Sequence, residues 1–84
     1  LFEKLWNGNR HSLIMSEIVE SFEGLRKSKQ DEHLPQFKSE AVELADACIR
    51  IFDYSCARGW RLADAITAKM KFNASRPRMH GKKF

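Results

Sequence analysis

The sequence predicts an all-α protein, and two observations carry this prediction. Apolar residues recur every three to four positions over long stretches, which is the spacing that places side chains on one face of a helix. No segment shows convincing alternation of apolar and polar residues, the pattern of a half-buried strand. We therefore expect a small helical domain that completes a four-helix-type bundle by forming an oligomer.

Three helices are predicted, at about residues 10–27, 39–58 and 63–73, and a basic tail at 74–84 follows them. Asn7-Gly8-Asn9 is a turn signal before the first helix. Ser39 suits the N-cap of the second helix, and Gly59 suits the residue that follows its end. The polar segment 28–38 contains Pro35 and reads as a connection, which Leu34 and Phe37 are expected to anchor to the core.

The second helix is unusual because apolar residues cover most of its circumference. Its charged side chains form a single stripe, made of Glu43, Asp46, Arg50 and Asp53. A surface helix normally has the reverse balance, so this helix is expected to be buried on most sides. The first helix presents a core face of Ile14, Ile18, Phe22 and Leu25, with Met15 beside it. Two such surfaces exceed what three short helices can cover, which predicts an oligomer.

Composition limits the class of protein. An 84-residue chain forms one small domain, expected here to span residues 1–84, and 43% apolar with 31% charged residues is ordinary for a folded one. No apolar run approaches the roughly 20 residues of a membrane span, and no secretory signal pattern is present, so no membrane partner is expected. Because the chain begins with Leu1 and not with Met, we expect an N-terminal segment to be missing from this sequence.

The net charge of +4 comes from 15 basic and 11 acidic residues. Four of the basic residues, Arg76, Arg78, Lys82 and Lys83, lie in the tail, which has no acid. Without them the balance is 11 against 11, so the excess positive charge belongs to the tail.

Cys48 and Cys56 both fall on the predicted second helix. Eight residues of helix separate them by about 12 Å, too far for a disulfide, which needs Cα atoms within about 7 Å. We interpret both as buried thiols in a reducing compartment, which predicts a cytoplasmic protein.

Two acidic pairs indicate a metal site. Glu17 and Glu20 lie three residues apart on the first helix, and Glu43 and Asp46 repeat that spacing on the second. Such pairs are common on solvated helices, where they only favour solubility. Four carboxylates on two facing helices repel one another unless a cation joins them, and oxygen ligands suit Mg²⁺, with Mn²⁺ as a substitute. Glu23 turns further away and is assigned to the solvated side.

Other metals fit the pattern less well. A di-iron bundle site needs Glu-x-x-His on two helices, and no histidine of this chain lies three residues after a glutamate. Zinc usually takes Cys or His ligands. Because Mg²⁺ is commonly shared with substrate phosphates, the acidic pairs point to a phosphorylated substrate.

Basic residues that suit such a substrate follow in the last third of the chain. Lys69 and Asn73 are four residues apart and share a helix face, and Arg76 and Arg78 can grip phosphate oxygens. The alternative is a solvated basic tail, or one that binds nucleic acid nonspecifically. No recognised nucleic-acid-binding motif is present, so nucleic acid is not the expected partner.

The residues resemble those of the MazG-like, all-α nucleoside triphosphate pyrophosphohydrolases. The resemblance rests on Glu-x2-Glu-x22-Glu-x2-Asp, on Lys69-x3-Asn73-x2-Arg76-Pro77 and on the ending His80-Gly81-Lys82-Lys83-Phe84. It covers roughly Arg10 to Phe84, and the phrases MSEIVESFEGLRK, ELADACIRIFD and KMKFNASRPRMHGKKF carry it locally. The acidic pattern alone is loose, but its combination with the basic residues is fairly specific.

This resemblance implies a homodimer or homotetramer and an enzyme. The implied reaction is Mg²⁺-dependent hydrolysis of a nucleoside triphosphate between the α and β phosphates, which gives monophosphate and pyrophosphate and clears the nucleotide pool. The implied metal ligands are Glu17, Glu20, Glu43 and Asp46. Either Glu17 or Glu20 is expected to activate the attacking water. Lys69 and Asn73 match substrate-contacting positions, and Arg76 is a weaker match.

Trp6 and Arg50 each have two possible roles. Trp6 either stacks on the base of the nucleotide or is a packing residue. Arg50 either contacts the substrate or pairs with Glu43 or Asp46 and keeps the seam between the helices neutral. The preferred base and sugar, and the number of metal ions, do not follow from the sequence. The rival functions are a noncatalytic nucleotide-sensing module and a small basic nucleic-acid-binding protein.

Overall fold

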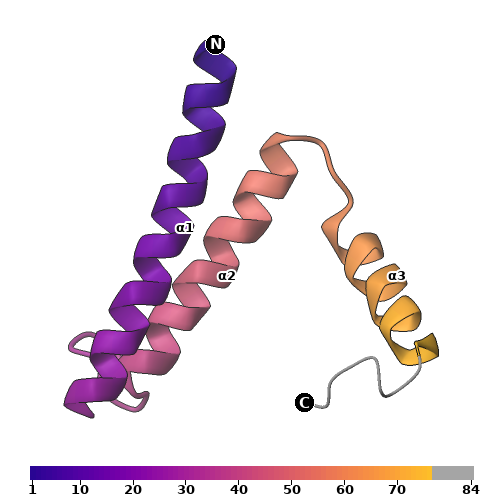
Figure 1. The fold of residues 1–84 in the computed structure, drawn as a ribbon. Helices are drawn as coiled ribbons and strands as arrows, with labels where there is room; N and C mark the ends of the chain where they lie inside the picture. Colours follow the sequence, from indigo (N-terminus) through magenta and orange to yellow (C-terminus); the bar gives the residue numbers. More distant parts are fainter. Residues whose placement is uncertain (77–84) are drawn as a thin grey trace. The chain divides into compact units, whose positions relative to one another are not determined.

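The computed structural model of this chain describes residues 1–76 and is all-α, which confirms the predicted fold class. Its helices are α1 (Phe2–Lys27), α2 (Ser39–Ala57) and α3 (Leu62–Ser75) (Figure 1). Pro77, Arg78 and the residues from His80 to Phe84 were predicted to belong to the basic tail, and they lie outside the described residues.

α1 begins at Phe2, and not at about Arg10 as the sequence predicted. The segment Asn7-Gly8-Asn9, predicted as a turn, lies inside the helix. The reason is packing: the Trp6 ring lies against that of Tyr54 on α2, with ring centroids 6.1 Å apart. A tertiary contact of this kind outweighs the low helix propensity of glycine and asparagine.

α1 and α2 run side by side in opposite directions (Figure 1). Their contacts follow an antiparallel order, since Trp6 meets Tyr54, Glu17 meets Arg50, and Gly24 meets the start of α2. This pairing brings the two predicted acidic pairs onto facing helices.

The seam between α1 and α2 is built from small residues. The buried positions include Ser21 and Gly24 on α1 and Ser39 and Ala47 on α2. A Cβ atom added at Gly24 would lie 2.9 Å from the backbone nitrogen of Glu40, closer than real Cβ atoms come. The two backbones therefore approach closely at this point because α1 has a glycine there.

The connection between α1 and α2 folds on itself. The backbone carbonyl of Lys29 accepts a hydrogen bond from the Ser39 amide (2.9 Å). Asp31 Oδ2 accepts two hydrogen bonds, from the backbone amides of His33 (3.0 Å) and Leu34 (2.9 Å). The predicted anchoring of Leu34 and Phe37 in the core is wrong, because both side chains are about half exposed. Hydrogen bonds within the segment hold the connection.

The hydrogen bonding of α2 starts at Lys38, one residue before the predicted start at Ser39. The Lys38 carbonyl accepts the first helical bond, from the Val42 amide (3.2 Å), so Ser39 lies inside the helix and not at its cap. At the other end of α2, the Trp60 amide donates to the Ser55 carbonyl and the Gly59 amide donates to the Cys56 carbonyl. Gly59 has a φ of 75°. This Schellman pattern agrees with the predicted role of Gly59.

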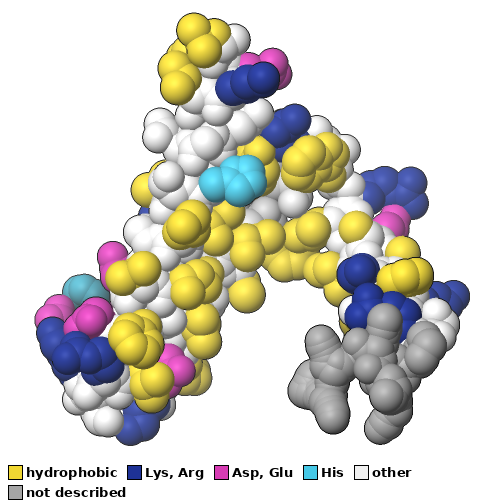
Figure 2. All heavy atoms as spheres, in the orientation of Figure 1, with side chains coloured by type: hydrophobic (Ala, Val, Ile, Leu, Met, Phe, Trp, Pro, Cys, Tyr) yellow, Lys and Arg dark blue, Asp and Glu magenta, His cyan; other side chains and the backbone are white. Residues whose placement is uncertain are grey.

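The large apolar side chains of α1 and α2 face outward in a single chain, as Figure 2 shows for one face of the molecule. Among residues 1–76 the buried apolar residues are Ala47 and Tyr54. Eight of the exposed large apolar residues are here called the outer stripe: Met15, Ile18, Val19, Phe22 and Leu25 on α1 and Leu44, Ile49 and Phe52 on α2. In the single chain the core face of α1 and most of α2 are therefore not buried, and their burial in an oligomer stays a prediction.

The thiols depart from the prediction as well. Cys48 and Cys56 are free, as expected, but both are exposed and not buried.

The chain divides into two compact units, and the second begins at Ser55. In it, α3 starts after Arg61, whose Nε donates to Asp64 Oδ2 (2.6 Å), and ends before Arg76, whose amide donates to the Asn73 carbonyl (3.3 Å). Within residues 1–76, no helix combines the length and apolar character that a bilayer crossing requires.

Replacement of Gly24 by alanine should lower the free energy of unfolding by on the order of 1 kcal/mol. The new methyl group would press on the backbone of α2 at Glu40, and a backbone atom cannot move aside as a flexible side chain can. Urea denaturation followed by circular dichroism at fixed protein concentration measures the change.

Gly8→Ala is the matched control, since nothing lies within 4 Å of a Cβ atom at that position of the same helix. Alanine should raise stability there by about 0.5–1 kcal/mol through helix propensity alone. Equal effects of the two substitutions would contradict the close approach of the helices at Gly24.

Candidate metal centre

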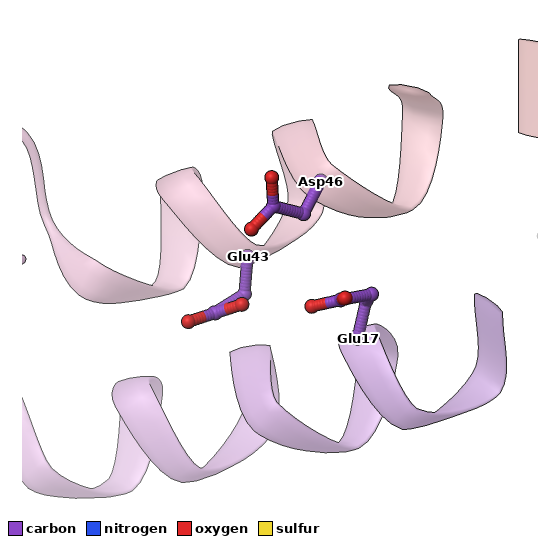
Figure 3. A group of neighbouring side chains, drawn as sticks. All are labelled: Glu17, Glu43 and Asp46. Atoms are coloured by element: carbon purple, nitrogen blue, oxygen red, sulfur yellow. The ribbon is translucent and has the colours of Figure 1, made fainter. Parts of the chain in front are cut away.

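Three carboxylates converge between α1 and α2. Glu17 extends from α1, and Glu43 and Asp46 extend from α2 into the same space (Figure 3). One oxygen from each of the three lies within 4.8 Å of the other two. The structure thus brings together three of the four predicted metal ligands.

Glu17 is the buried member of this cluster, with 8% of its surface exposed. Its Oε2 accepts a hydrogen bond from Arg50 Nε on α2 at 2.7 Å. The guanidinium holds the pKa of the Glu17 carboxyl below its usual range, although burial opposes this effect. Glu17 is therefore held as a carboxylate inside the seam.

Glu43 lies beside Glu17 and behaves in the opposite way. Burial raises the pKa of the Glu43 carboxyl to about 7, and a hydrogen bond to Glu17 adds to the rise. The negative charges of Glu20, Glu17 and Asp46 contribute further. Near neutral pH the cluster therefore retains a proton on Glu43, because three close carboxylates repel one another.

Glu20, the fourth predicted ligand, does not join the group of three. Its side chain is exposed, but its charge reaches Glu43 and both residues line the same hollow. Glu23 pairs instead with Arg26 at 2.9 Å on the surface, in agreement with its assignment to the solvated side.

The donor set fits a hard divalent cation. Every donor is a carboxylate oxygen, the type of ligand that Mg²⁺ and Mn²⁺ prefer. The oxygens already lie close together on two helices. The negative charges of neighbouring carboxylates help to raise the pKa of Glu43, and a cation would neutralise these charges. Glu17, Glu43 and Asp46 are the residues that would hold the ion, and Glu20 is close enough to assist.

A hollow of about 180 Å³ adjoins the cluster at Glu43. Its lining residues are Glu20, Glu23, Gly24, Lys27, Lys29, Ser39 and Glu43. Lys27 and Lys29 were not recognised from the sequence as candidate functional residues. A signal was present, because Lys27 follows Glu20 by seven residues, which is two turns along the same helix face.

Arg50 and Trp6 both have partners within residues 1–54. Arg50 pairs with Glu17 across the seam. One of the two predicted roles, neutralising the seam, is therefore observed, but the partner is Glu17 and not Glu43 or Asp46. The half-buried Trp6 packs against Tyr54 and carries the Arg10 guanidinium 4.9 Å from its ring centroid. Packing is therefore the observed role of Trp6, and base stacking stays a prediction.

Lys69, Asn73 and Arg76 lie in the second compact unit and are exposed. Lys69 Nζ lies 4.9 Å from the ring centroid of Phe72, and the Arg76 guanidinium lies 5.6 Å from the same ring. The two cations thus share one aromatic neighbour on α3. Their predicted contact with substrate phosphates stays a prediction.

The chain matches no protein-family model, no curated protein and no solved structure. Its functional interpretation therefore rests on the geometry of the acidic cluster and on the sequence resemblance described above.

The acidic cluster should make stability depend on pH. The folded chain binds a proton at Glu43 more tightly than the unfolded chain does, since the pKa of this carboxyl rises from 4.5 to about 7 on folding. The free energy of unfolding should therefore fall, by on the order of 1 kcal/mol, as pH rises from about 4.5 to about 7. Denaturation at a series of pH values without divalent cations measures this slope.

Glu43→Gln should remove most of that slope, whereas Glu23→Gln, which changes a carboxylate outside the cluster, should leave it unchanged. Glu17 contributes in a different window: its lowered pKa gives stability that is present above its usual pKa and is lost as pH falls below it. An unaltered slope in Glu43→Gln would show that the cluster does not control the titration.

Proposed function

We propose that this protein is a Mg²⁺-dependent nucleoside triphosphate pyrophosphohydrolase of the MazG-like class. The observation that carries the proposal is the convergence of Glu17, Glu43 and Asp46 within 4.8 Å between α1 and α2. These are three of the four positions that match the metal ligands of that class, and they come from two helices. The reaction is cleavage between the α and β phosphates, in the cytoplasm, where it would clear the nucleotide pool.

Glu17, Glu43 and Asp46 would hold the cation, and the substrate phosphates would bind beside it. When bound, Mg²⁺ neutralises phosphate charge and makes the α-phosphorus more electrophilic. Glu20 is the better candidate for the base that activates water, since Glu17 belongs to the three carboxylates that would hold the cation, whereas Glu20 lines the adjoining hollow. Glu20 accepts a proton as the water oxygen bonds to the α-phosphorus. The bond from that phosphorus to the bridging oxygen then breaks and pyrophosphate leaves.

Positive side chains stabilise the phosphates. Lys27 and Lys29 line the hollow that begins at Glu43, so they are candidate phosphate contacts next to the cluster. Lys69, Asn73 and Arg76 supply further contacts in this proposal, as the resemblance implies. Most of the rate enhancement then comes from positioning and from charge stabilisation, as is general for phosphoryl transfer.

The proposal includes a second copy of the chain. The outer stripe exposes eight large apolar side chains on two adjacent helices, and the buried apolar residues of the described chain are Ala47 and Tyr54 alone. A hairpin with so small a core is marginal by itself. Two copies that place their outer stripes together form a four-helix-type bundle with two-fold symmetry, and two such dimers can form a tetramer.

A hydrolysis panel of ribo- and deoxyribonucleoside triphosphates with Mg²⁺ tests the activity. The expected products are monophosphate and pyrophosphate, and the best substrate identifies the preferred base and sugar. Glu43→Gln and Asp46→Asn should each lower kcat at least about 100-fold, because each removes a cation ligand. Phosphorus NMR of the products, with circular dichroism to verify folding, gives both readouts.

Glu3→Gln is the control for activity, since it alters an exposed carboxylate in the first turn of α1, outside the cluster and the hollow. Near-normal turnover in Asp46→Asn would overturn the metal assignment. Diphosphate and phosphate as products would place the cleavage elsewhere. Tight binding without turnover would favour a nucleotide-sensing module, and salt-sensitive binding of DNA or RNA would favour a nucleic-acid-binding protein.

Light scattering at micromolar concentration should detect a dimer or tetramer. Phe22→Glu places a charge in the outer stripe and should shift the protein toward the monomer, because an unpaired charge is costly in an apolar interface. Ser16→Glu adds the same charge to an exposed position of α1 outside the stripe and should leave the mass unchanged. A monomeric wild-type chain would contradict the proposed assembly.

A further inference from the structure

The ion pair between Arg50 and Glu17 differs from the other two recorded among residues 1–76. Arg26–Glu23 and Arg61–Asp64 join residues one turn apart on a single helix, and their side chains are exposed. Arg50 and Glu17 are 33 residues apart and join α2 to α1 at 2.7 Å. The Glu17 side chain is only 10% exposed, so its charge depends on this partner.

Arg50 also lies beside the carboxylates that would hold a cation. Glu17 is both a member of the group of three carboxylates and the acceptor of the guanidinium contact. Arg50 follows Asp46 by four residues, so the two side chains share a face of α2. A fixed positive charge is thus built into the rim of the acidic cluster.

We propose that Arg50 is an internal counter-cation of the acidic cluster, which holds Glu17 while no ion is bound and is displaced from it when a divalent cation binds. This inference rests on the proposed function and goes beyond it, since it assigns Arg50 to the control of cation affinity. A guanidinium and a divalent ion that share one carboxylate repel each other, so part of the binding energy of the ion is spent on moving Arg50 away. Arg50 therefore stabilises the metal-free chain and weakens its affinity for the ion.

Removal of the guanidinium should have two opposite effects. Arg50→Gln should bind Mn²⁺ or Mg²⁺ on the order of tenfold more tightly, because a repulsive unit charge within a few ångströms is lost. The same variant should unfold at a lower temperature without divalent cation, because Glu17 is left buried with no positive partner. Saturating cation should restore the lost stability.

Isothermal titration with Mn²⁺, without nucleotide, measures the affinity, and thermal unfolding with and without Mn²⁺ measures the stability. Arg26→Gln is the matched control because it removes an arginine–glutamate pair from the exposed face of α1. It should bind the ion as the wild-type chain does. Unchanged or weaker binding by Arg50→Gln would overturn the inference: weaker binding would make Arg50 a residue that positions Glu17, and unchanged binding with a raised KM would make it a substrate contact.

Arg50→Lys tests the inference if Arg50→Gln does not fold. Lysine keeps the charge but is more strongly hydrated and lacks the planar fork, so it should release Glu17 more easily than arginine does. We expect an affinity gain of about threefold, a smaller change than for glutamine. No gain in this folded variant would overturn the inference.

The same titration separates this inference from the proposed function. Wild-type chain that shows no saturable binding, or binding that persists in Glu43→Gln, would remove the metal centre and the inference together. Binding that requires Glu43 but does not strengthen in either Arg50 variant would leave the metal centre in place and reject the role of Arg50.

Discussion

Charge balance in the seam between α1 and α2 is the constraint on which the rest of this structure depends. Small residues bring the two helices close, and Glu17, Glu43 and Asp46 then share one confined space. Two devices keep the repulsion tolerable in the empty cluster: the Arg50 guanidinium on Glu17 and a proton that Glu43 retains near neutral pH. In the proposed function a cation would replace both devices, and the seam would then be a binding site as well as a packing interface.

The seam also explains why the large apolar side chains of the hairpin lie on its outside. Where polar and small side chains occupy the contact between two helices, large apolar side chains must point elsewhere, and the outer stripe is the result. Closure of that stripe by a second copy would exclude water from the outer flank of each acidic cluster and strengthen its electrostatics. In that assembly, association and the proposed chemistry would be linked through the same pair of helices.

Residue patterns predicted the helical class, the facing acidic pairs and the role of Gly59, because these depend on local spacing. Contacts distant in sequence decided the rest. Helix propensity placed a turn at Asn7-Gly8-Asn9, but packing of Trp6 on Tyr54 keeps α1 helical there. The apolar character of α2 predicted burial of Cys48 and Cys56, yet a single chain supplies one partner helix to residues 39–54. One alternative for Arg50 was a pair with Glu43 or Asp46 on its own helix, but it reaches Glu17 on α1, because register between helices does not follow from spacing along one of them.

The self-contained connection between α1 and α2 has a consequence for the order of folding. Asp31 and the Lys29–Ser39 hydrogen bond close it without help from the core, and loops of about ten residues close within about 10–100 ns. Helical hairpins with such local contacts form early, before slower encounters between chains. The carboxylates of Glu17 and Glu43 then meet in the first stage of folding. If the cluster binds divalent cations as proposed, cations in the medium would act on the nascent hairpin and not only on the finished protein.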